Sequence, residues 1–225
     1  RGVYVLADSL TPDPHTIVVG KRTEAEVGTV EIQGVEVAPQ GRVLAPPRKA
    51  ARRIDILGDS VTAGFGSEGR GPKCPWRARE ENALGTYGAL AAQELAADYV
   101  ALAASGKGVV RNADPRDGEP LPVLFERTLP HELRPWKFAG APPPDVVLVN
   151  LGANDFLLGI PDEAAFRATY ARLVARVRQV YPQAFIVLVL GPMLWDEARH
   201  DARTLVRSWL NAIIGDRAGA GDSRL

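Results

Sequence analysis

Hydrophobic and polar positions follow two different patterns along the chain. Between Val3 and Val43, apolar residues alternate with polar ones in short runs that glycine and proline separate, as in "GTVEIQGVEV". A period of two is typical of β-strands that bury one face. We therefore expect residues 1–47 to form a small, jelly-roll-like β-sandwich domain, partial because so short a segment holds only a few strands. The stretch "APPRKAARR" then disfavours both helix and central strand, which indicates a boundary.

From residue 48 to residue 225, strand and helix patterns alternate. Short aliphatic runs predict parallel strands, buried on both faces, at 54–57, 99–104, 146–151 and 185–190. Apolar residues at helical spacing predict helices at 163–180 and 197–214, the second ended by Gly215. This order predicts an α/β domain with a doubly wound parallel sheet, in which one crossover passes through the irregular segment 108–144. Ligands of such sheets bind at the carboxyl ends of the strands.

Composition narrows the possible partners. The chain has 27 Lys and Arg against 27 Asp and Glu, so no net field attracts it to nucleic acid or to a membrane, and we expect neither as a partner. The single cysteine, Cys74, excludes an internal disulfide and a multi-thiolate zinc site. With no metal-ligand spacing and no G-x-G-x-x-G after a strand, we expect no cofactor and no metal.

The first strand ends in "IDILGDSVTAGFG", which sets Ser60 at the carboxyl edge of the sheet. A serine hydroxyl becomes a nucleophile when a base takes its proton and donors stabilise the negative charge that follows. The next two strand ends, "AASGKGVV" and "VNLGANDF", supply Gly106 and Asn154. Backbone N–H groups at Ser60 and Gly106 and the Asn154 amide can converge on one oxygen, which predicts a site for acyl transfer. Taken alone, Ser60 is better explained as a helix N-cap; together with the Gly106 and Asn154 motifs in this order, it is better explained as a nucleophile.

Residues next to the three candidate catalytic residues are expected to have structural roles. Asp59 braces its turn, and Asp155 caps the turn after Asn154, so neither is assigned a catalytic role. Gly108 relieves crowding in its loop. Trp195, at the fourth strand end, is either a stacking wall for a sugar ring or a core aromatic. The loops that we expect around the cleft offer a polar and aromatic mix: Arg70, Lys73, Trp76 and Asn112.

These motifs, in this order, resemble the SGNH or GDSL hydrolase superfamily, whose Ser, Gly and Asn match Ser60, Gly106 and Asn154. A closer resemblance is to carbohydrate esterase family 2, through "KRTEAEVGTVEIQG", "RRIDILGDSVTAGFGSEG" and "PDVVLVNLGANDF". The resemblance implies a secreted or periplasmic acetyl esterase that removes O-acetyl groups from xylan or another plant hemicellulose, and so an acetylated oligo- or polysaccharide as partner. The alternatives are a non-catalytic carbohydrate-binding module of the same fold and a lipase or thioesterase of the superfamily.

The resemblance also implies a histidine shortly after an aspartate, in a loop near the C-terminus. The histidines here are His15, His131 and His200, and no D-x-x-H or D-x-H follows the last expected helix. We interpret all three as surface or packing residues. We expect the domain to lack its C-terminal strand and histidine loop within these 225 residues, and the alternative is a catalytically impaired remnant.

Overall fold

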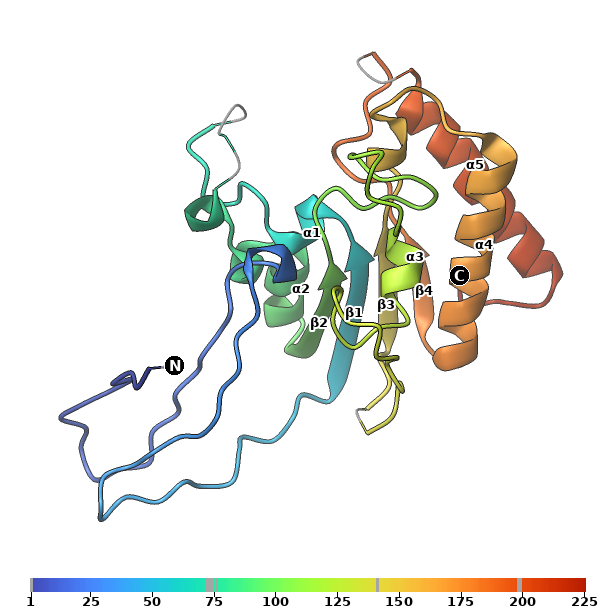
Figure 1. Ribbon diagram of the computed structural model, residues 1–225. Helices are drawn as coiled ribbons and strands as arrows, with labels where there is room; N and C mark the ends of the chain where they lie inside the picture. The colour runs from blue at the N-terminus through green and yellow to red at the C-terminus, as the bar shows by residue number, and fades with distance from the viewer. Residues whose placement is uncertain (1, 72–74, 76, 141, 198–199) are drawn as a thin grey trace.

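Four parallel strands form a single sheet in the computed structural model, which describes residues 2–71, 75, 77–140, 142–197 and 200–225. The strands are β1 (Arg52–Gly58), β2 (Ala97–Ala103), β3 (Val146–Asn150) and β4 (Phe185–Leu188). Their order across the sheet is β2-β1-β3-β4, as Figure 1 shows. All four lie where the aliphatic runs predict them, and the doubly wound α/β class is confirmed.

Helices cover both faces of this sheet. Helix α2 (Tyr87–Glu94) lies on one face, and α3 (Leu121–Leu124), α4 (Glu163–Val180) and α5 (Ala202–Gly219) lie on the other (Figure 1). The short α1 (Ser60–Ala63) follows β1 directly, and four 3-10 turns complete the described elements: η1 (Ala25–Val27), η2 (Ala78–Glu80), η3 (Ala83–Gly85) and η4 (Asn154–Phe156). In the described part of the chain, no helix combines the length and apolar character needed to cross a membrane.

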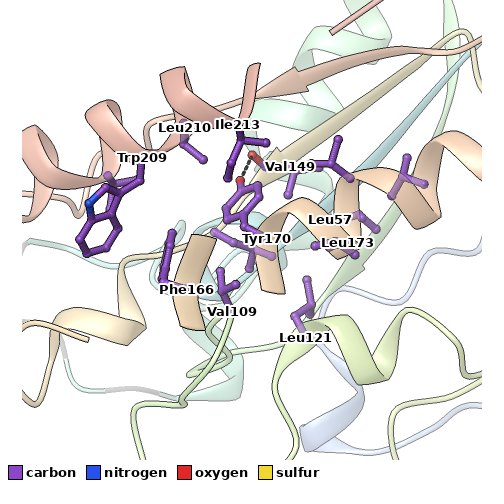
Figure 2. Close-up of a cluster of buried hydrophobic side chains, with 14 of the residues drawn as sticks. Leu57, Val109, Leu121, Val149, Phe166, Tyr170, Leu173, Trp209, Leu210 and Ile213 are labelled. Atoms are coloured by element: carbon purple, nitrogen blue, oxygen red, sulfur yellow. Dashed lines mark hydrogen bonds between the residues drawn. The ribbon is translucent and has the colours of Figure 1, made fainter. Parts of the chain in front are cut away.

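The main core lies between the sheet and helices α4 and α5. Helix α4 has the predicted bounds, and its apolar stripe, with Phe166 and Tyr170 fully buried, packs against Val149 of β3 and Trp209 of α5 (Figure 2). The Tyr170 hydroxyl donates a hydrogen bond to the Val149 carbonyl at 3.3 Å. A smaller cluster on the α2 side contains Ile54 and Ile56, so β1 is covered on both faces.

Strand register brings the ends of three strands to the same level. Gly58, the last residue of β1, pairs with Ala103 at the end of β2 and with Asn150 at the end of β3. After β1 the chain goes first to β2 on one side and then crosses to β3 on the other. The ends of β1 and β3 therefore form the switch point where doubly wound sheets bind their ligands.

The expected strands of the N-terminal region do not form. Described residues 2–49 contain η1 but no strand, and their apolar side chains are exposed, Val3 by 90% and Val18 by 86%. Figure 1 shows the middle of this segment, at η1, beside α1 and α2, while the chain on either side extends away from the sheet before it enters β1. Alternation predicts a strand only where a partner supplies the ladder hydrogen bonds, and these runs have no such partner. The domain boundary near residue 47 stays a prediction.

The last helix is shifted relative to the sequence pattern. It begins at Ala202 instead of residue 197, and it continues through Gly215 to Gly219. The Asp196 carboxylate accepts hydrogen bonds from the backbone N–H and the hydroxyl of Thr204, both at 2.8 Å, and so satisfies donors of the first turn. His200 consequently lies before the helix, where it was expected to lie within it.

An ion cluster connects the C-terminal end of α5 to α4. Asp222, with a side chain 8% exposed, pairs with Arg178 at 2.9 Å and with Arg217 at 2.8 Å. Burial alone would raise the pKa of the Asp222 carboxyl, but these two guanidinium groups lower the pKa to about 2. A lowered carboxyl pKa stabilises the fold above its unfolded-state pKa, and that stability is lost as pH falls through the folded-state pKa.

We predict that Asp222→Asn lowers the free energy of unfolding by about 2 kcal/mol at neutral pH. The deficit should shrink between about pH 4 and pH 2, because the wild-type carboxylate is then protonated too. Urea denaturation at several pH values measures this, with Asp216→Asn at an exposed position of α5 as control. A deficit that stays constant down to pH 2 would contradict the role of the ion cluster.

Candidate active site

Ser60 is the first residue of α1 and follows β1 after a tight turn. Asp59 is the N-cap of α1, and its carboxylate accepts the Val61 N–H at 3.1 Å, which confirms that it braces the turn. A Cβ at Gly58 would lie 2.0 Å from the Thr62 hydroxyl oxygen, so the turn requires glycine there. Ser60 itself is partly exposed at the edge of the sheet.

The carboxamide of Asn154 connects three loops. Its nitrogen Nδ2 donates to the Lys107 carbonyl at 2.8 Å and lies 3.4 Å from the Asp59 carboxylate oxygen Oδ2. Asp59 precedes Ser60, and Lys107 follows Gly106. The structure therefore brings the loops of all three predicted residues together around one buried amide, which is 8% exposed.

Gly106 forms a turn that other residues cannot easily adopt. Its φ of +77° lies in the left-handed region, and its carbonyl accepts the Ala113 N–H at 2.8 Å. Among the contacts of the described residues, no protein acceptor takes the Gly106 N–H. The next residue, Lys107, is buried and its ammonium donates to Asp117 at 2.6 Å. The turn is thus anchored on its C-terminal side, while the Gly106 N–H is left available to a ligand.

Asp155 organises the loop after Gly106, which corrects the expectation that it caps its own turn. Its fully buried carboxylate accepts backbone N–H groups from Val109 and Val110, both at 2.8 Å, and from Arg111 at 3.2 Å. Burial nevertheless raises its pKa above the ordinary value. A Cβ at Gly108 would lie 2.6 Å from Asp155 Oδ2, so Gly108 permits this clamp and does more than relieve crowding.

Of the aromatic and polar residues expected around the cleft, some are exposed as expected, one is buried, and two lie outside the described residues. Trp195 is 50% exposed in the loop after β4, so it is not a core aromatic. Its role in sugar stacking stays a prediction. Asn112 is buried and accepts the Gly108 N–H at 3.0 Å, so it supports the loop instead of lining the cleft. Arg70 is exposed, whereas Lys73 and Trp76 lie outside the described residues.

The three histidines are exposed, and their described contacts lie away from Ser60. His15 hydrogen bonds to the Thr11 carbonyl at 3.0 Å, and His131 approaches Glu26 at 3.6 Å. His200 lies in a turn with a φ of 53°. Within the described part of the chain, no hydrogen bond connects any of them to the loops of Ser60, Gly106 or Asn154.

A cavity of about 410 Å³ lies beside the Ser60 turn and is lined by Val61 but not by Ser60, Gly106 or Asn154. Sequence reasoning missed two of its lining residues. Asn150 and Tyr87 line it, and the Asn150 amide donates to the Tyr87 hydroxyl at 3.1 Å. That hydroxyl also shares a hydrogen bond with Thr62 at 2.8 Å. The signal for Asn150 was a polar residue ending the aliphatic run "VVLVN" at the switch point.

Known proteins resemble this chain over most of its length. Residues 56–223 match the GDSL-like lipase/acylhydrolase family, and residues 1–47 match the N-terminal region of carbohydrate esterase 2. The cellulase/esterase CelE of Acetivibrio thermocellus is 34% identical over 223 residues, which are 98% of this chain and 26% of that protein. An acetylxylan esterase/glucomannan deacetylase of Cellvibrio japonicus is 31% identical over 188 residues, 80% of this chain and 50% of the relative.

Solved structures agree with these relatives. A family two carbohydrate esterase from Clostridium thermocellum, in complex with cellohexaose, has a TM-score of 0.84 and 33% identity, covering 90% of this chain and 61% of that one. The chain thus spans between a quarter and about three fifths of the length of these relatives. Because the family match includes the Ser60, Gly106 and Asn154 loops, the chain belongs to the GDSL-like lipase/acylhydrolase family, with family 2 carbohydrate esterases as its relatives.

Proposed function

We propose that the protein is a carbohydrate esterase that removes O-acetyl groups from xylan or another plant hemicellulose, with Ser60 as nucleophile. The observation that supports this most strongly is the Asn154 amide, which contacts the neighbours of both Ser60 and Gly106. A relative is named acetylxylan esterase/glucomannan deacetylase, and another was solved with cellohexaose. The substrate is accordingly an acetylated oligo- or polysaccharide, and export from the cell stays a prediction.

In the proposed reaction, the Ser60 hydroxyl oxygen attacks the acetyl carbonyl carbon while a general base accepts its proton. The carbonyl electron pair moves onto oxygen, and the resulting oxyanion receives hydrogen bonds from the backbone N–H groups of Ser60 and Gly106 and from Asn154. Collapse expels the sugar oxygen, which takes up a proton. Water then attacks the acetyl-serine ester, releasing acetate and restoring the hydroxyl. We assign the base to none of the three histidines, because their described contacts lie elsewhere.

The Asn154 amide has one strong and one weak acceptor within the protein. Its 2.8 Å bond to the Lys107 carbonyl fixes the orientation of the carboxamide. Its second contact, at 3.4 Å to Asp59, is long for a hydrogen bond and therefore weak. In the proposed reaction, an oxyanion replaces this long contact with a shorter hydrogen bond to a charge that is absent from the ground state, so the amide gains more in the transition state.

A carbohydrate-binding module without catalysis is the second candidate, favoured by the exposure of Trp195 and by the cellohexaose complex of a relative. A substitution of Ser60 distinguishes the two functions, because hydrolysis needs the Ser60 hydroxyl and carbohydrate binding does not. In the natural full-length protein, we predict that Ser60→Ala abolishes release of acetate from acetylated xylan and of p-nitrophenol from p-nitrophenyl acetate. Titration calorimetry with cellohexaose serves as the binding measurement. Cellohexaose binding by a parent protein that releases no acetate would establish the module instead of the esterase.

Asn154→Ala should lower kcat for p-nitrophenyl acetate about a hundredfold or more, because loss of one oxyanion donor typically raises the barrier by about 2.7–4 kcal/mol. KM should change little, since the donor acts on charge that develops in the transition state. Asn211→Ala, on the exposed face of α5, is the matched control and should keep parental rates. Equal turnover in Asn154→Ala and the parent would remove the assignment of this donor.

Asp155→Asn tests the clamp behind Gly106. An asparagine keeps one acceptor but turns an NH2 group toward the N–H donors of residues 109–111. We expect the free energy of unfolding to fall by about 1–3 kcal/mol and kcat to fall as well. Urea denaturation and steady-state kinetics measure the two effects, with the exposed Asp114→Asn in the same loop as control. Parental stability together with parental kcat would show that the clamp is dispensable.

A further inference from the structure

Glu24 is the one buried residue among described residues 2–49. Only 8% of its surface is exposed, whereas the aliphatic side chains of the same segment lie in solvent. Charged residues are rarely buried unless they have partners, and apolar residues would be expected first in any contact made only for stability. In this segment the charged side chain is buried and the aliphatic ones are exposed, which indicates a specific role for the Glu24 carboxylate.

Glu24 forms hydrogen bonds with Glu81 and with Ser105, the residue that precedes Gly106. Its carboxylate oxygen Oε2 accepts the backbone N–H of Ser105 at 2.6 Å. Its own N–H donates to the Glu81 carboxylate at 2.5 Å, and nearby the Arg22 carbonyl accepts the Ala83 N–H at 2.8 Å. Through Glu24, the N-terminal segment thus contacts both the segment before α2 and the residue that directly precedes Gly106.

This contact is an inefficient way to gain stability. Among the described residues, Glu24 Oε1, Glu81 Oε2 and Ser105 Oγ are buried without a hydrogen-bond partner. Each unsatisfied polar atom carries a desolvation cost, and two acidic side chains at one junction also repel each other. Natural proteins tolerate such costs mainly where function requires them.

Glu24 and Asn154 act on opposite sides of the same turn. The Ser105 N–H is fixed by Glu24, and the Lys107 carbonyl is fixed by Asn154. Gly106 lies between these two anchors, at a left-handed φ of +77°. Because a glycine has wide conformational freedom, the direction of its N–H depends on how its neighbours are held. Without Glu24, the Ser105 N–H loses its acceptor, and the turn is no longer held on the N-terminal side of Gly106.

We propose that Glu24 is a positioning residue for the reaction: through its carboxylate, the N-terminal segment holds the Ser105–Gly106 peptide so that the Gly106 N–H points at the acyl oxygen of a substrate on Ser60. This inference rests on the proposed esterase function. It assigns to the N-terminal segment a part in transition-state stabilisation, since the geometry of an oxyanion donor must be fixed before the charge develops.

The first test is kinetic and uses the natural full-length protein. Glu24→Ala should lower kcat for p-nitrophenyl acetate about tenfold, the effect of a modest loss in transition-state stabilisation, with KM within about twofold of the parent. Glu24→Gln keeps an oxygen that accepts the Ser105 N–H and should recover most of the rate. Glu26→Gln is the matched control, because Glu26 lies two residues away, is exposed and approaches only His131 in the described contacts. Parental kcat in Glu24→Ala, or no recovery in Glu24→Gln, would overturn the proposal.

The second test does not depend on activity. Hydrogen exchange of the Ser105 and Gly106 amides should accelerate about tenfold or more in Glu24→Ala, while exchange in β1 and β3 stays parental. Unchanged exchange at Ser105 would overturn the proposal even if kcat falls, because the carboxylate then does not hold the turn. A parent protein without esterase activity would instead overturn the proposed function, and with it the catalytic role of Glu24. The exchange result would still show whether the contact holds the turn.

Discussion

The candidate site depends on one buried amide. Asn154 is almost fully enclosed, and a buried N–H group without an acceptor is costly, so its carboxamide must find partners. It finds them in the Lys107 carbonyl and the Asp59 carboxylate, which belong to the two loops that carry Gly106 and Ser60. The requirement to satisfy one amide therefore brings together three loops that leave different strands. This requirement brings the turns that carry Ser60, Gly106 and Asn154 together at the carboxyl edge of the sheet.

The rest of the structure keeps this arrangement rigid. Strand register sets the ends of β1, β2 and β3 at one level, and α4 and α5 pack against the face of the sheet that includes Val149 of β3. Asp155 collects three backbone N–H groups of the loop after Gly106, and Glu24 reaches from the N-terminal segment to the residue before it. The carboxylates of Asp155 and Glu24 and the amide of Asn154 thus hold the backbone around Gly106, which has no side chain that could form contacts of its own. A site assembled in advance is what electrostatic stabilisation of an oxyanion requires.

The sequence predicted those parts whose cause is local or periodic. Helix α4 has the expected bounds because its apolar stripe repeats at helical spacing. The meeting of the loops that carry Ser60, Gly106 and Asn154 could be predicted because parallel strands end at one edge, whereas the catalytic roles of these residues stay a prediction. The predictions failed where partners distant in sequence decide. The alternating runs near Val18 are exposed and unpaired, since alternation does not supply a neighbouring strand. Asn112 and Asp155 act on backbone groups of turns, and Glu24 contacts a residue 81 positions away, which no spacing rule indicates.

The central claim is that Ser60, Gly106 and Asn154 converge on one oxygen, and a crystal structure of the natural full-length protein with a diethyl phosphoryl group on Ser60 tests it most directly. The phosphoryl oxygen stands in for the oxyanion of the tetrahedral intermediate. The account predicts that this oxygen lies about 2.7–3.1 Å from both the Gly106 nitrogen and Asn154 Nδ2. A phosphoryl oxygen that points into solvent, away from both donors, would contradict it.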